Sequence, residues 1–344
     1  MTGLAAIVAG FLIAWFVTGR LCDPRSRFHL LDRPNERSLH VRPTPRSGGL
    51  GILAGLLAGC GWLMWREGMP EGFVAVSLGL LVAALISMWD DFGHLPARVR
   101  LAAHLFAALS LLSGGLWMPS LEVPGFAEPF RWGYWGWPLC LVYVIWMMNL
   151  YNFMDGMDGF AGGMAAWGFA FLGLFAWNAD HPFYASMAWV VTAASLGFLW
   201  FNFPPAKIFM GDVGAVPLGY LKAAFALWGV REGIFPFWVP VLLFSPFIVD
   251  ATVTLMRRAS RGEKVWEAHR SHFYQRLVQL GWGHRRTVLA EYGLMVLAGI
   301  SALFQARLPA GGVQGLAVWS WCLVYAGLAY QVSRLERSRE SLRL

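Results

Sequence analysis

Charged residues are scarce in this sequence: Asp, Glu, Lys and Arg make up 14% of its 344 residues. A water-soluble domain of ordinary composition has roughly 25% charged and about 45–50% apolar residues. Here 57% of the residues are hydrophobic and 15% are aromatic, and aromatic rings favour the interfaces of a bilayer. Scarce charge combined with abundant apolar side chains excludes an ordinary soluble enzyme and indicates a protein whose outer surface faces lipid.

Cysteine is also scarce. The four residues Cys22, Cys60, Cys140 and Cys322 form no Cys-x-x-Cys pair. The sequence therefore indicates neither a disulfide framework nor a cysteine-based metal site. A signal peptide is not indicated either, because the apolar run 1–19 has no charged leading region and no small-residue cleavage motif. We interpret this run as a first membrane span.

The period-two alternation of a membrane β-barrel does not occur. The sequence instead contains apolar runs of about 20 residues, the length that a bilayer-spanning helix needs. These runs predict an all-α fold, a polytopic transmembrane helical bundle in a single domain over residues 1–344. The eleven predicted spans are 2–19, 48–65, 72–89, 101–118, 134–151, 160–177, 184–201, 213–228, 234–256, 287–306 and 314–332.

Basic residues are unevenly distributed between the predicted loops. Of 27 Lys and Arg residues, 22 lie in segments that eleven spans place on one side of the membrane: 20–47, 90–100, 202–212, 257–286 and 333–344. Because basic loops stay in the cytoplasm, we predict that this side is cytoplasmic, with a periplasmic N-terminus and a cytoplasmic C-terminus. This distribution explains the net charge of +7 and gives no indication of a nucleic-acid partner.

Five aspartates follow three of the predicted spans on the cytoplasmic side. Asp90 and Asp91 end the third span, Asp155 and Asp158 follow the fifth, and Asp212 follows the seventh. Adjacent carboxylates repel one another unless a cation lies between them, and a divalent ion that prefers oxygen ligands would satisfy them. One such aspartate could be an ordinary helix-end residue, whereas five at three span ends indicate a site.

Residues suited to a nucleotide accompany these aspartates. Asn152 has an amide that both donates and accepts hydrogen bonds, and Phe209 offers a flat face on which a base can stack. His269, Arg270 and His272 lie within four residues and suit a pyrophosphate, since Arg can bind it bidentately and His can donate hydrogen bonds. The alternatives are metal binding by the two histidines and a basic loop attracted to anionic lipids.

Two further charges lie inside predicted spans. Asp250 lies in the ninth span, and Arg257, seven positions on, falls on the same helix face just beyond its end. Asp250 suits either a structural ion pair with Arg257 or a catalytic role. Lys222, in the eighth span, can extend its long side chain to an interface.

The motifs, in chain order, resemble those of the polyprenyl-phosphate N-acetylhexosamine-1-phosphate transferases (glycosyltransferase family 4), to which the phospho-MurNAc-pentapeptide translocase is more distantly related. The similarity covers nearly the whole chain. The similar segments are LLDRPNERSLHVRPTPRSGGLGI (30–52), DDFGHLPARVRL (90–101), NFMDGMDG (152–159), FNFPPAKIFMGDVG (201–214) and HRSH (269–272).

The resemblance implies an enzyme that transfers a sugar-1-phosphate from a UDP-N-acetylhexosamine to undecaprenyl phosphate, with UMP as the second product. It also implies dependence on Mg²⁺ bound by Asp212, with Mn²⁺ as a candidate substitute. The implied catalytic residues are the other four aspartates: Asp90, Asp91, Asp155 and Asp158. For Asp90 and Asp91 we favour metal or orienting roles over that of a base, because a phosphate monoester is already mostly dianionic at pH 7.

Donor binding is implied for a second set of residues. Phe209 occupies the position expected to stack on uracil, and Lys207 and Arg98 are expected to help screen phosphate charge. The remaining members bind the nucleoside, the pyrophosphate and the sugar: Asn152, His269, Arg270 and His272.

Two features depart from the common family pattern. Better-known members carry His-x-His-His where this chain has His-Arg-Ser-His, and Arg98 stands where Lys is frequent. The first difference resembles a subgroup that uses deoxygenated sugars such as FucNAc or QuiNAc, so it leaves the donor sugar open.

The resemblance places the chain in the bacterial inner membrane as a multi-pass protein with its active site facing the cytoplasm. It would initiate O-antigen (lipopolysaccharide) or other cell-envelope polysaccharide synthesis, with a homodimer as a candidate assembly. Two alternatives remain. One is the phospho-MurNAc-pentapeptide translocase of peptidoglycan synthesis, and the other is a secondary transporter, although transporters usually bind their substrates near the bilayer midplane.

Overall fold

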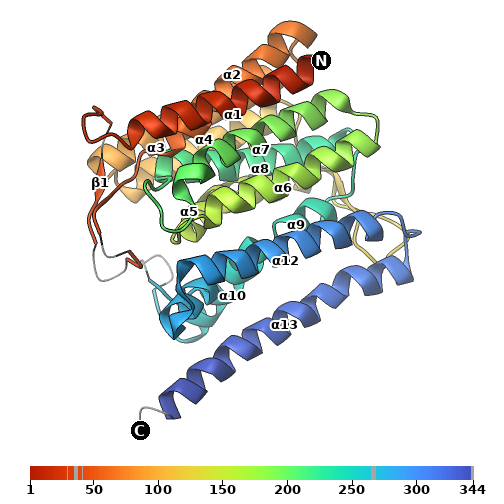
Figure 1. The fold of residues 1–344 in the computed structure, drawn as a ribbon. Coiled ribbons are helices and arrows are strands. Elements are labelled where there is room, and N and C mark those ends of the chain that lie inside the picture. The colour runs from red at the N-terminus through yellow and green to blue at the C-terminus, as the bar shows by residue number, and fades with distance from the viewer. Residues whose placement is uncertain (29, 35–37, 41, 265–268, 342–344) are drawn as a thin grey trace.

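A computed structural model describes residues 1–344 except 29, 35–37, 41, 265–268 and 342–344. The described part is mostly helical (Figure 1), which confirms the predicted all-α class. The long helices are α1 (Thr2–Leu21), α2 (Gly49–Glu67), α3 (Phe73–Gly93), α4 (Ala97–Ser113), α5 (Gly136–Met154), α6 (Phe160–Asn178), α7 (Pro182–Asn202), α8 (Asp212–Arg231), α10 (Ser245–Ser260), α12 (Gly283–Gln305) and α13 (Gly312–Ser341).

Short elements occupy the connections. They include the helices α9 (Trp238–Leu243) and α11 (Phe273–Leu277), a 3₁₀ turn (Gly133–Trp135) and a π-helical turn (Val278–Trp282). Two antiparallel pairs of two-residue strands join β1 (Leu31–Asp32) to β2 (Thr44–Pro45) and β3 (Ser120–Leu121) to β4 (Phe130–Arg131). These strands were not predicted, because two residues are too few to produce a recognisable pattern.

Nine helices in the described residues are long and apolar enough to cross a membrane. The predicted span 101–118 corresponds to α4, which has 17 residues, and the predicted span 234–256 to α9 and α10, which are separated at Phe244. Pro246 near the start of α10 explains this break, since proline has no N–H to continue a helix. The hydroxyl of Ser245 instead donates to the carbonyl of Leu242 at 2.6 Å. Eleven spans and the sides of the two termini remain predictions.

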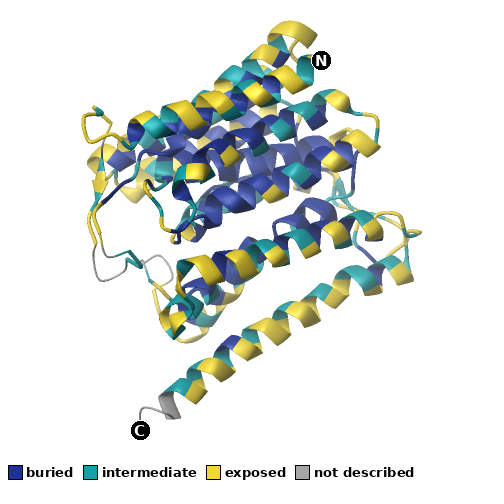
Figure 2. Ribbon diagram, viewed as in Figure 1, coloured by how far each residue is buried: buried dark blue, intermediate teal, exposed yellow. Residues whose placement is uncertain are grey.

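Helix α8 lies at the centre of the bundle. Every residue from Val213 to Gly229 is buried, and α3 and α5 pack against this helix. Helix α13 is exposed along most of its length, and α1 has one exposed face (Figure 2); both carry large exposed apolar side chains such as Leu4 and Leu316. Exposed apolar surface of this extent is expected where lipid is the solvent.

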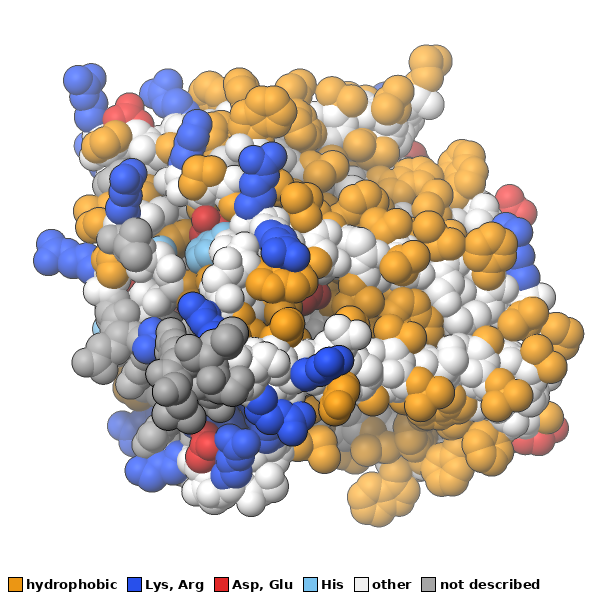
Figure 3. Space-filling model, turned by 60° about the horizontal axis from the view of Figure 1, so that its bottom comes forward, with side chains coloured by type: hydrophobic (Ala, Val, Ile, Leu, Met, Phe, Trp, Pro, Cys, Tyr) orange, Lys and Arg blue, Asp and Glu red, His pale blue; other side chains and the backbone are white. Residues whose placement is uncertain are grey.

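The outer surface is also divided by charge. On the face in Figure 3, most Lys and Arg side chains gather toward one end, and hydrophobic side chains cover much of the remaining length. This arrangement agrees with the separation of basic loops from apolar spans in the sequence.

Close backbone contacts bring the loop before α2 onto the start of α8. The N–H groups of Gly48 and Gly49 donate to the carbonyls of Phe209 and Met210 at 2.9 and 2.8 Å. A Cβ on Gly49 would lie 2.3 Å from the nitrogen of Gly214, so a larger residue would force the two segments apart. These contacts hold the neighbouring Arg46 near the first turn of α8.

Candidate active site

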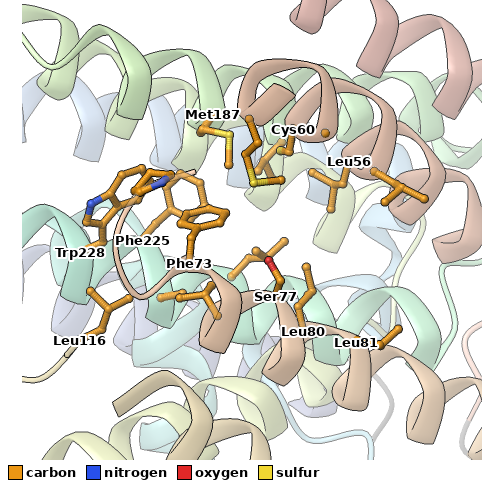
Figure 4. Close-up of a pocket in the computed structure, with 18 of the residues that line it drawn as sticks. Leu56, Cys60, Phe73, Ser77, Leu80, Leu81, Leu116, Met187, Phe225 and Trp228 are labelled. Carbon is orange, nitrogen blue, oxygen red and sulfur yellow. The ribbon is translucent and has the colours of Figure 1, made fainter. Parts of the chain in front are cut away.

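Two cavities of similar volume differ sharply in their lining. The apolar cavity, of ≈ 290 Å³, lies among α2, α3, α7 and α8 and is lined by side chains such as Leu56, Phe73, Phe225 and Trp228 (Figure 4). The carboxylate cavity, of ≈ 270 Å³, lies where α3, α5 and α7 end and α8 begins. Recognition of a nucleotide needs charged or hydrogen-bonding groups in the lining, and most side chains around the apolar cavity have none. The carboxylate cavity is therefore the candidate active site.

The carboxylate cavity collects half of the predicted site residues. Those that line it are Asp91, Asn152, Asp155, Asp158, Phe209 and Asp212. The predicted residues that do not line it are Asp90, Arg98, Lys207, His269, Arg270 and His272. The cavity thus joins three segments that are far apart in sequence but meet where long buried helices end.

Asp91 connects the end of α3 to the start of α8. One of its carboxylate oxygens accepts from the backbone N–H of Val213 at 2.9 Å, and the other from that of Asp212 at 3.3 Å. Negative charge is favourable at a helix N-terminus, where backbone N–H groups are unpaired. Nε of Arg46 lies 3.8 Å from the same carboxylate, and the Arg46 guanidinium also donates to the Asp91 carbonyl at 2.5 Å. Asp91 and Arg46 therefore fix the wall of the cavity.

Asp90 points to a different partner. Its carboxylate accepts from Nη1 of Arg100 at 3.0 Å and from the backbone N–H of Leu95 at 2.5 Å. Arg98, the residue chosen from the sequence, is exposed and does not line the cavity. The basic residue of α4 that pairs with Asp90 is therefore Arg100 and not Arg98. The two side chains point in different directions, because two positions along a helix correspond to more than half a turn.

The MDGMDG loop is held by contacts from α7, α12 and the segment before α8. The Asp158 carboxylate accepts from the backbone N–H of Ala206 at 3.0 Å, and Nδ1 of His284 lies 3.0 Å from it. The Asn202 amide accepts from the N–H of Gly159 and donates to the carbonyl of Ile208, each at 2.9 Å. Gly159 has φ +75°, which favours glycine. These bonds fix the loop that carries Asp155 into the cavity.

Asp155 and Asp212 have few compensating donors. Among the described residues, no N–H group is hydrogen-bonded to either carboxylate, and Asp212 lies in hydrogen-bonding contact with the Asp90 carboxyl and beside Asp91. Burial, and then the negative charges of Asp212, Asp91 and Asp158, raise the pKa of Asp155 well above its ordinary value. Carboxylates crowded in this way favour either a bound proton or a bound cation.

The oxygen-rich lining can supply ligands for a hard divalent cation, but too few of them to hold the ion alone. Asp155 and Asp212 offer the oxygen ligands that Mg²⁺ prefers. No group of three His, Cys, Asp or Glu residues among those the structure describes converges closely enough to hold an ion alone. Mg²⁺ commonly binds through one or two carboxylates, substrate phosphates and water, and these residues fit that mode.

Phe209 and Asn152 supply the groups expected for a nucleoside. Both line the cavity, and Asn202 beside them is already committed to backbone bonds. The His40 ring contacts Phe209 edge-on, with ring centroids 4.9 Å apart, and its Nε2 is buried without a hydrogen-bond partner in the described residues. The loop before α2 therefore covers the aromatic side of the cavity.

The segment 269–277 lies beside the cavity and reaches it through Gln275 of α11. Asp250 of α10 organises this segment by accepting from the backbone N–H groups of Phe273 and Tyr274, at 2.9 and 3.1 Å, and it lies 3.1 Å from Nδ1 of His272. The expected pairing of Asp250 with Arg257 is not found in the structure. Arg257 donates to the carbonyl of Ser271 at 2.7 Å instead.

The environment of His269 favours its neutral form. Burial, followed by the neighbouring positive charges, lowers the pKa of His269 to about 4. Its ring lies 4.8 Å from that of His272, and its Nδ1 is 2.9 Å from the Ser271 hydroxyl. A neutral imidazole can still bind phosphate or sugar through a hydrogen bond, but it adds no positive charge at pH 7.

Several cavity residues were not predicted from the sequence. Lys207 is exposed and does not line the cavity. The unpredicted cavity residues with charged or polar side chains are Asp32, Ser38, His40, Arg46, Asn202, Gln275 and His284. Arg46 and His40 belong to the PTPR-containing segment and could have been found there, whereas nothing in the local sequence singles out His284.

Comparison with known proteins gives consistent matches. Residues 73–230 match the family described as Glycosyl transferase family 4. The chain is 30% identical over 304 residues to a probable undecaprenyl-phosphate N-acetylglucosaminyl 1-phosphate transferase of Bacillus subtilis (strain 168), covering 87% of this chain and 84% of that protein.

Two other relatives extend the comparison. The chain is 30% identical to a decaprenyl-phosphate N-acetylglucosaminephosphotransferase of Mycobacterium leprae (strain TN), covering 98% of this chain and 90% of that protein. It is 26% identical to a phospho-N-acetylmuramoyl-pentapeptide-transferase of Halalkalibacterium halodurans, covering 76% of this chain and 83% of that protein.

Proposed function

The chain belongs to glycosyl transferase family 4, the polyprenyl-phosphate sugar-1-phosphate transferases, and from this premise we propose the reaction of its carboxylate cavity. The protein transfers an N-acetylhexosamine-1-phosphate from a UDP-sugar to undecaprenyl phosphate. An oxygen of the lipid phosphate forms a bond to the β-phosphorus of the donor. The bond from that phosphorus to the bridging oxygen breaks, and UMP leaves.

One observation carries this proposal: carboxylates, an amide and an aromatic ring line one cavity at the ends of membrane-length helices. The acceptor's polyprenyl chain cannot leave the bilayer, whereas the nucleotide sugar is dissolved in water. A cavity at a helix end is accessible to both. Phe209 would stack on the uracil and Asn152 would bind the nucleoside through its amide.

Two anions must meet in this reaction, so the main tasks of the protein are to position them and to balance their charge. Asp155 and Asp212 would hold Mg²⁺ together with the donor phosphates. When bound, this ion would neutralise the pyrophosphate and polarise the phosphorus. Arg46 contacts Asp91 and also lines the cavity. Its guanidinium would bind an anionic group of a substrate.

No general base is required for the acceptor, because the second pKa of a phosphate monoester is about 6. Asp90 is paired with Arg100 and the Leu95 N–H, which suits an orienting role. We assign Asp90 to the placement of Arg100 and Asp91 to the placement of Arg46. His269 and His272 would complete the donor site from the segment 269–277, with Arg270 supplying positive charge.

The proposed location follows from the same chemistry. The protein is a multi-pass membrane protein, and we place it in the bacterial inner membrane with the carboxylate cavity facing the cytoplasm, on the side with the basic loops. Undecaprenyl-diphosphate-sugar formed there would initiate O-antigen or another envelope polysaccharide. The His-Arg-Ser-His sequence leaves the N-acetylhexosamine open, with deoxygenated sugars such as FucNAc or QuiNAc as candidates beside GlcNAc.

The test is UMP release by the purified protein in detergent with undecaprenyl phosphate and Mg²⁺. The donors are UDP-GlcNAc, UDP-GalNAc, UDP-QuiNAc, UDP-FucNAc and UDP-MurNAc-pentapeptide, each assayed separately. We expect UMP that requires both lipid and metal, with the highest rate from one of the four UDP-N-acetylhexosamines. The highest rate from UDP-MurNAc-pentapeptide would assign the chain to peptidoglycan synthesis, and no UMP from any donor with a folded protein would contradict the proposal.

A further inference from the structure

Helix α11 depends on neighbouring helices for its position. It has five residues, Phe273–Leu277, and continues into the π-helical turn Val278–Trp282, where the non-helical Gly281 separates it from α12. A helical stretch this short is unstable in water without packing partners. One face of α11 meets the active site: Gln275 lines the carboxylate cavity, and the Tyr274 hydroxyl packs so closely on Gly156 that a Cβ there would lie 2.2 Å from it. Any displacement of α11 would therefore change the cavity wall beside Asp155.

The flank of α11 that faces α13 carries a charged anchor. Arg276 is 8% exposed, and its guanidinium donates to both carboxylate oxygens of Glu336 on α13, with the Nε–Oε1 bond at 2.6 Å. Nη2 of Arg276 also donates to the Ser333 hydroxyl at 3.2 Å. A bidentate Arg–carboxylate pair fixes orientation as well as distance. The contact therefore determines the direction in which α11 presents Gln275.

The remainder of α13 is mostly exposed but is tied to the bundle at several points. Among its described residues, Gly315 and Val332 are buried, and most of the length between them is exposed (Figure 2). The Tyr325 hydroxyl lies 2.6 Å from that of Ser245, and Nε1 of Trp321 donates to the Ser301 hydroxyl at 2.9 Å. Near the first end of α13, Nε1 of Trp319 donates to the carbonyl of Pro124 at 2.9 Å. Near the second, Ser333 and Glu336 contact Arg276 of α11, and Arg339 donates to the carbonyl of Gln279 in the following π-helical turn at 2.6 Å.

We infer that Glu336 is a positioning residue of the donor site: it acts through Arg276 to hold α11, and with it Gln275 and His272, against the carboxylate cavity. The inference rests on the proposed function, since it names a determinant of the donor side of the same site. Asp250 anchors the beginning of α11 from α10, and Glu336 anchors its flank from α13. The last membrane-length helix, whose residues do not line the carboxylate cavity, thus contributes to donor binding.

The test compares Glu336→Gln with a matched control, Arg334→Gln, whose exposed side chain lies on the same helix. For Glu336→Gln we expect the KM for the donor to rise roughly tenfold, since small displacements of positioning groups can cost up to about a hundredfold. We expect kcat and the KM for undecaprenyl phosphate to stay within about twofold of the parent values. Glu336→Asp, and the exchange of Arg276→Glu with Glu336→Arg, should recover part of the donor KM, whereas the control should not change it.

A second measurement does not depend on turnover. The affinity for UDP-GlcNAc, measured by calorimetry in detergent, should fall in Glu336→Gln while the thermal midpoint of the protein stays close to that of the parent. An unchanged donor KM and affinity would overturn the inference. So would equal changes for donor and acceptor together with a lower midpoint, because they would show that Glu336 merely anchors α13. If the parent releases no UMP from any donor, the proposed function fails, and the affinity comparison still decides the role of Glu336.

Discussion

The carboxylate cavity and the segment 269–277 are held in place by different means. The cavity is formed where buried helices end, and two of its own aspartates, Asp158 and Asp91, accept from the backbone N–H groups of Ala206 and Val213. The segment is held by side chains from two other helices, Asp250 and Glu336. The aspartates that support the cavity also line it, whereas Asp250 and Glu336 support the segment without lining the cavity and can be altered singly. In the proposed reaction the cavity would bind the reacting phosphates, and the segment would adjust donor binding.

The largest effect is expected in the cavity, from Asp212→Asn. The substitution keeps the size of the side chain and removes the charge that would bind the cation. We expect a loss of roughly a thousandfold in kcat, equivalent to about 4 kcal/mol, measured as UMP release. The protein should keep its elution volume and thermal midpoint in detergent. Activity near the parent value would remove Asp212 from the site.

A cation and a proton should compete for Asp155. Because the pKa of Asp155 is raised well above its ordinary value, the carboxyl binds a proton more tightly than an isolated Asp, and cation binding must release that proton. Metal affinity should therefore rise as the pH rises above the ordinary range of aspartate. We expect this dependence in Mn²⁺ titrations with UDP present and lipid omitted, and a weaker dependence in Asp155→Asn. An identical pH dependence in both proteins would exclude Asp155 as a ligand.

A smaller effect is expected from the anchor of the segment, in Asp250→Asn. An Asn amide cannot accept all the hydrogen bonds that Asp250 accepts, so buried donors lose their partners at about 1–3 kcal/mol each. We expect the donor KM to rise roughly tenfold or more and the thermal midpoint to fall. Thr254→Val is the matched control, because Thr254 donates to the same carboxylate at 3.1 Å and its loss leaves the other donors in place. If the donor KM and the thermal midpoint of Asp250→Asn change no more than those of Thr254→Val, the segment does not depend on Asp250.

The smallest effects should separate two neighbouring arginines. Arg100 pairs with Asp90 at 3.0 Å, and its side chain is 41% exposed, so solvent weakens the interaction. We expect Arg100→Gln to lower kcat/KM by about five- to tenfold and Arg98→Gln to change it by less than about twofold. The comparison uses the same chemical change two positions apart on α4. A larger loss from Arg98→Gln would contradict the placement of Arg100 beside the aspartates.

Sequence patterns predicted the cavity better than the segment. Apolar runs place helix ends to within a few residues, and polar residues at those ends, such as Asp155 and Asp212, then converge because the helices pack side by side. The position of Arg100 rather than Arg98 depends on the rotation of one helix, which apolar length does not reveal. The pairing of Arg276 with Glu336 joins residues 60 positions apart, and neither residue has a local pattern that marks it. The break in the predicted span 234–256 was missed although Pro246 lies inside it.

The most direct test follows the phosphorus atom itself. A UDP-sugar labelled with ³²P at the β-phosphate, chosen as the donor that gives the highest UMP release, is incubated with the protein, undecaprenyl phosphate and Mg²⁺. Transfer of a sugar-1-phosphate predicts that the label moves into the organic phase with the lipid, in an amount equal to the UMP formed, and that Asp212→Asn abolishes this movement. Label that stays in the aqueous phase as UDP, with or without sugar reaching the lipid, would contradict the reaction assigned to the carboxylate cavity.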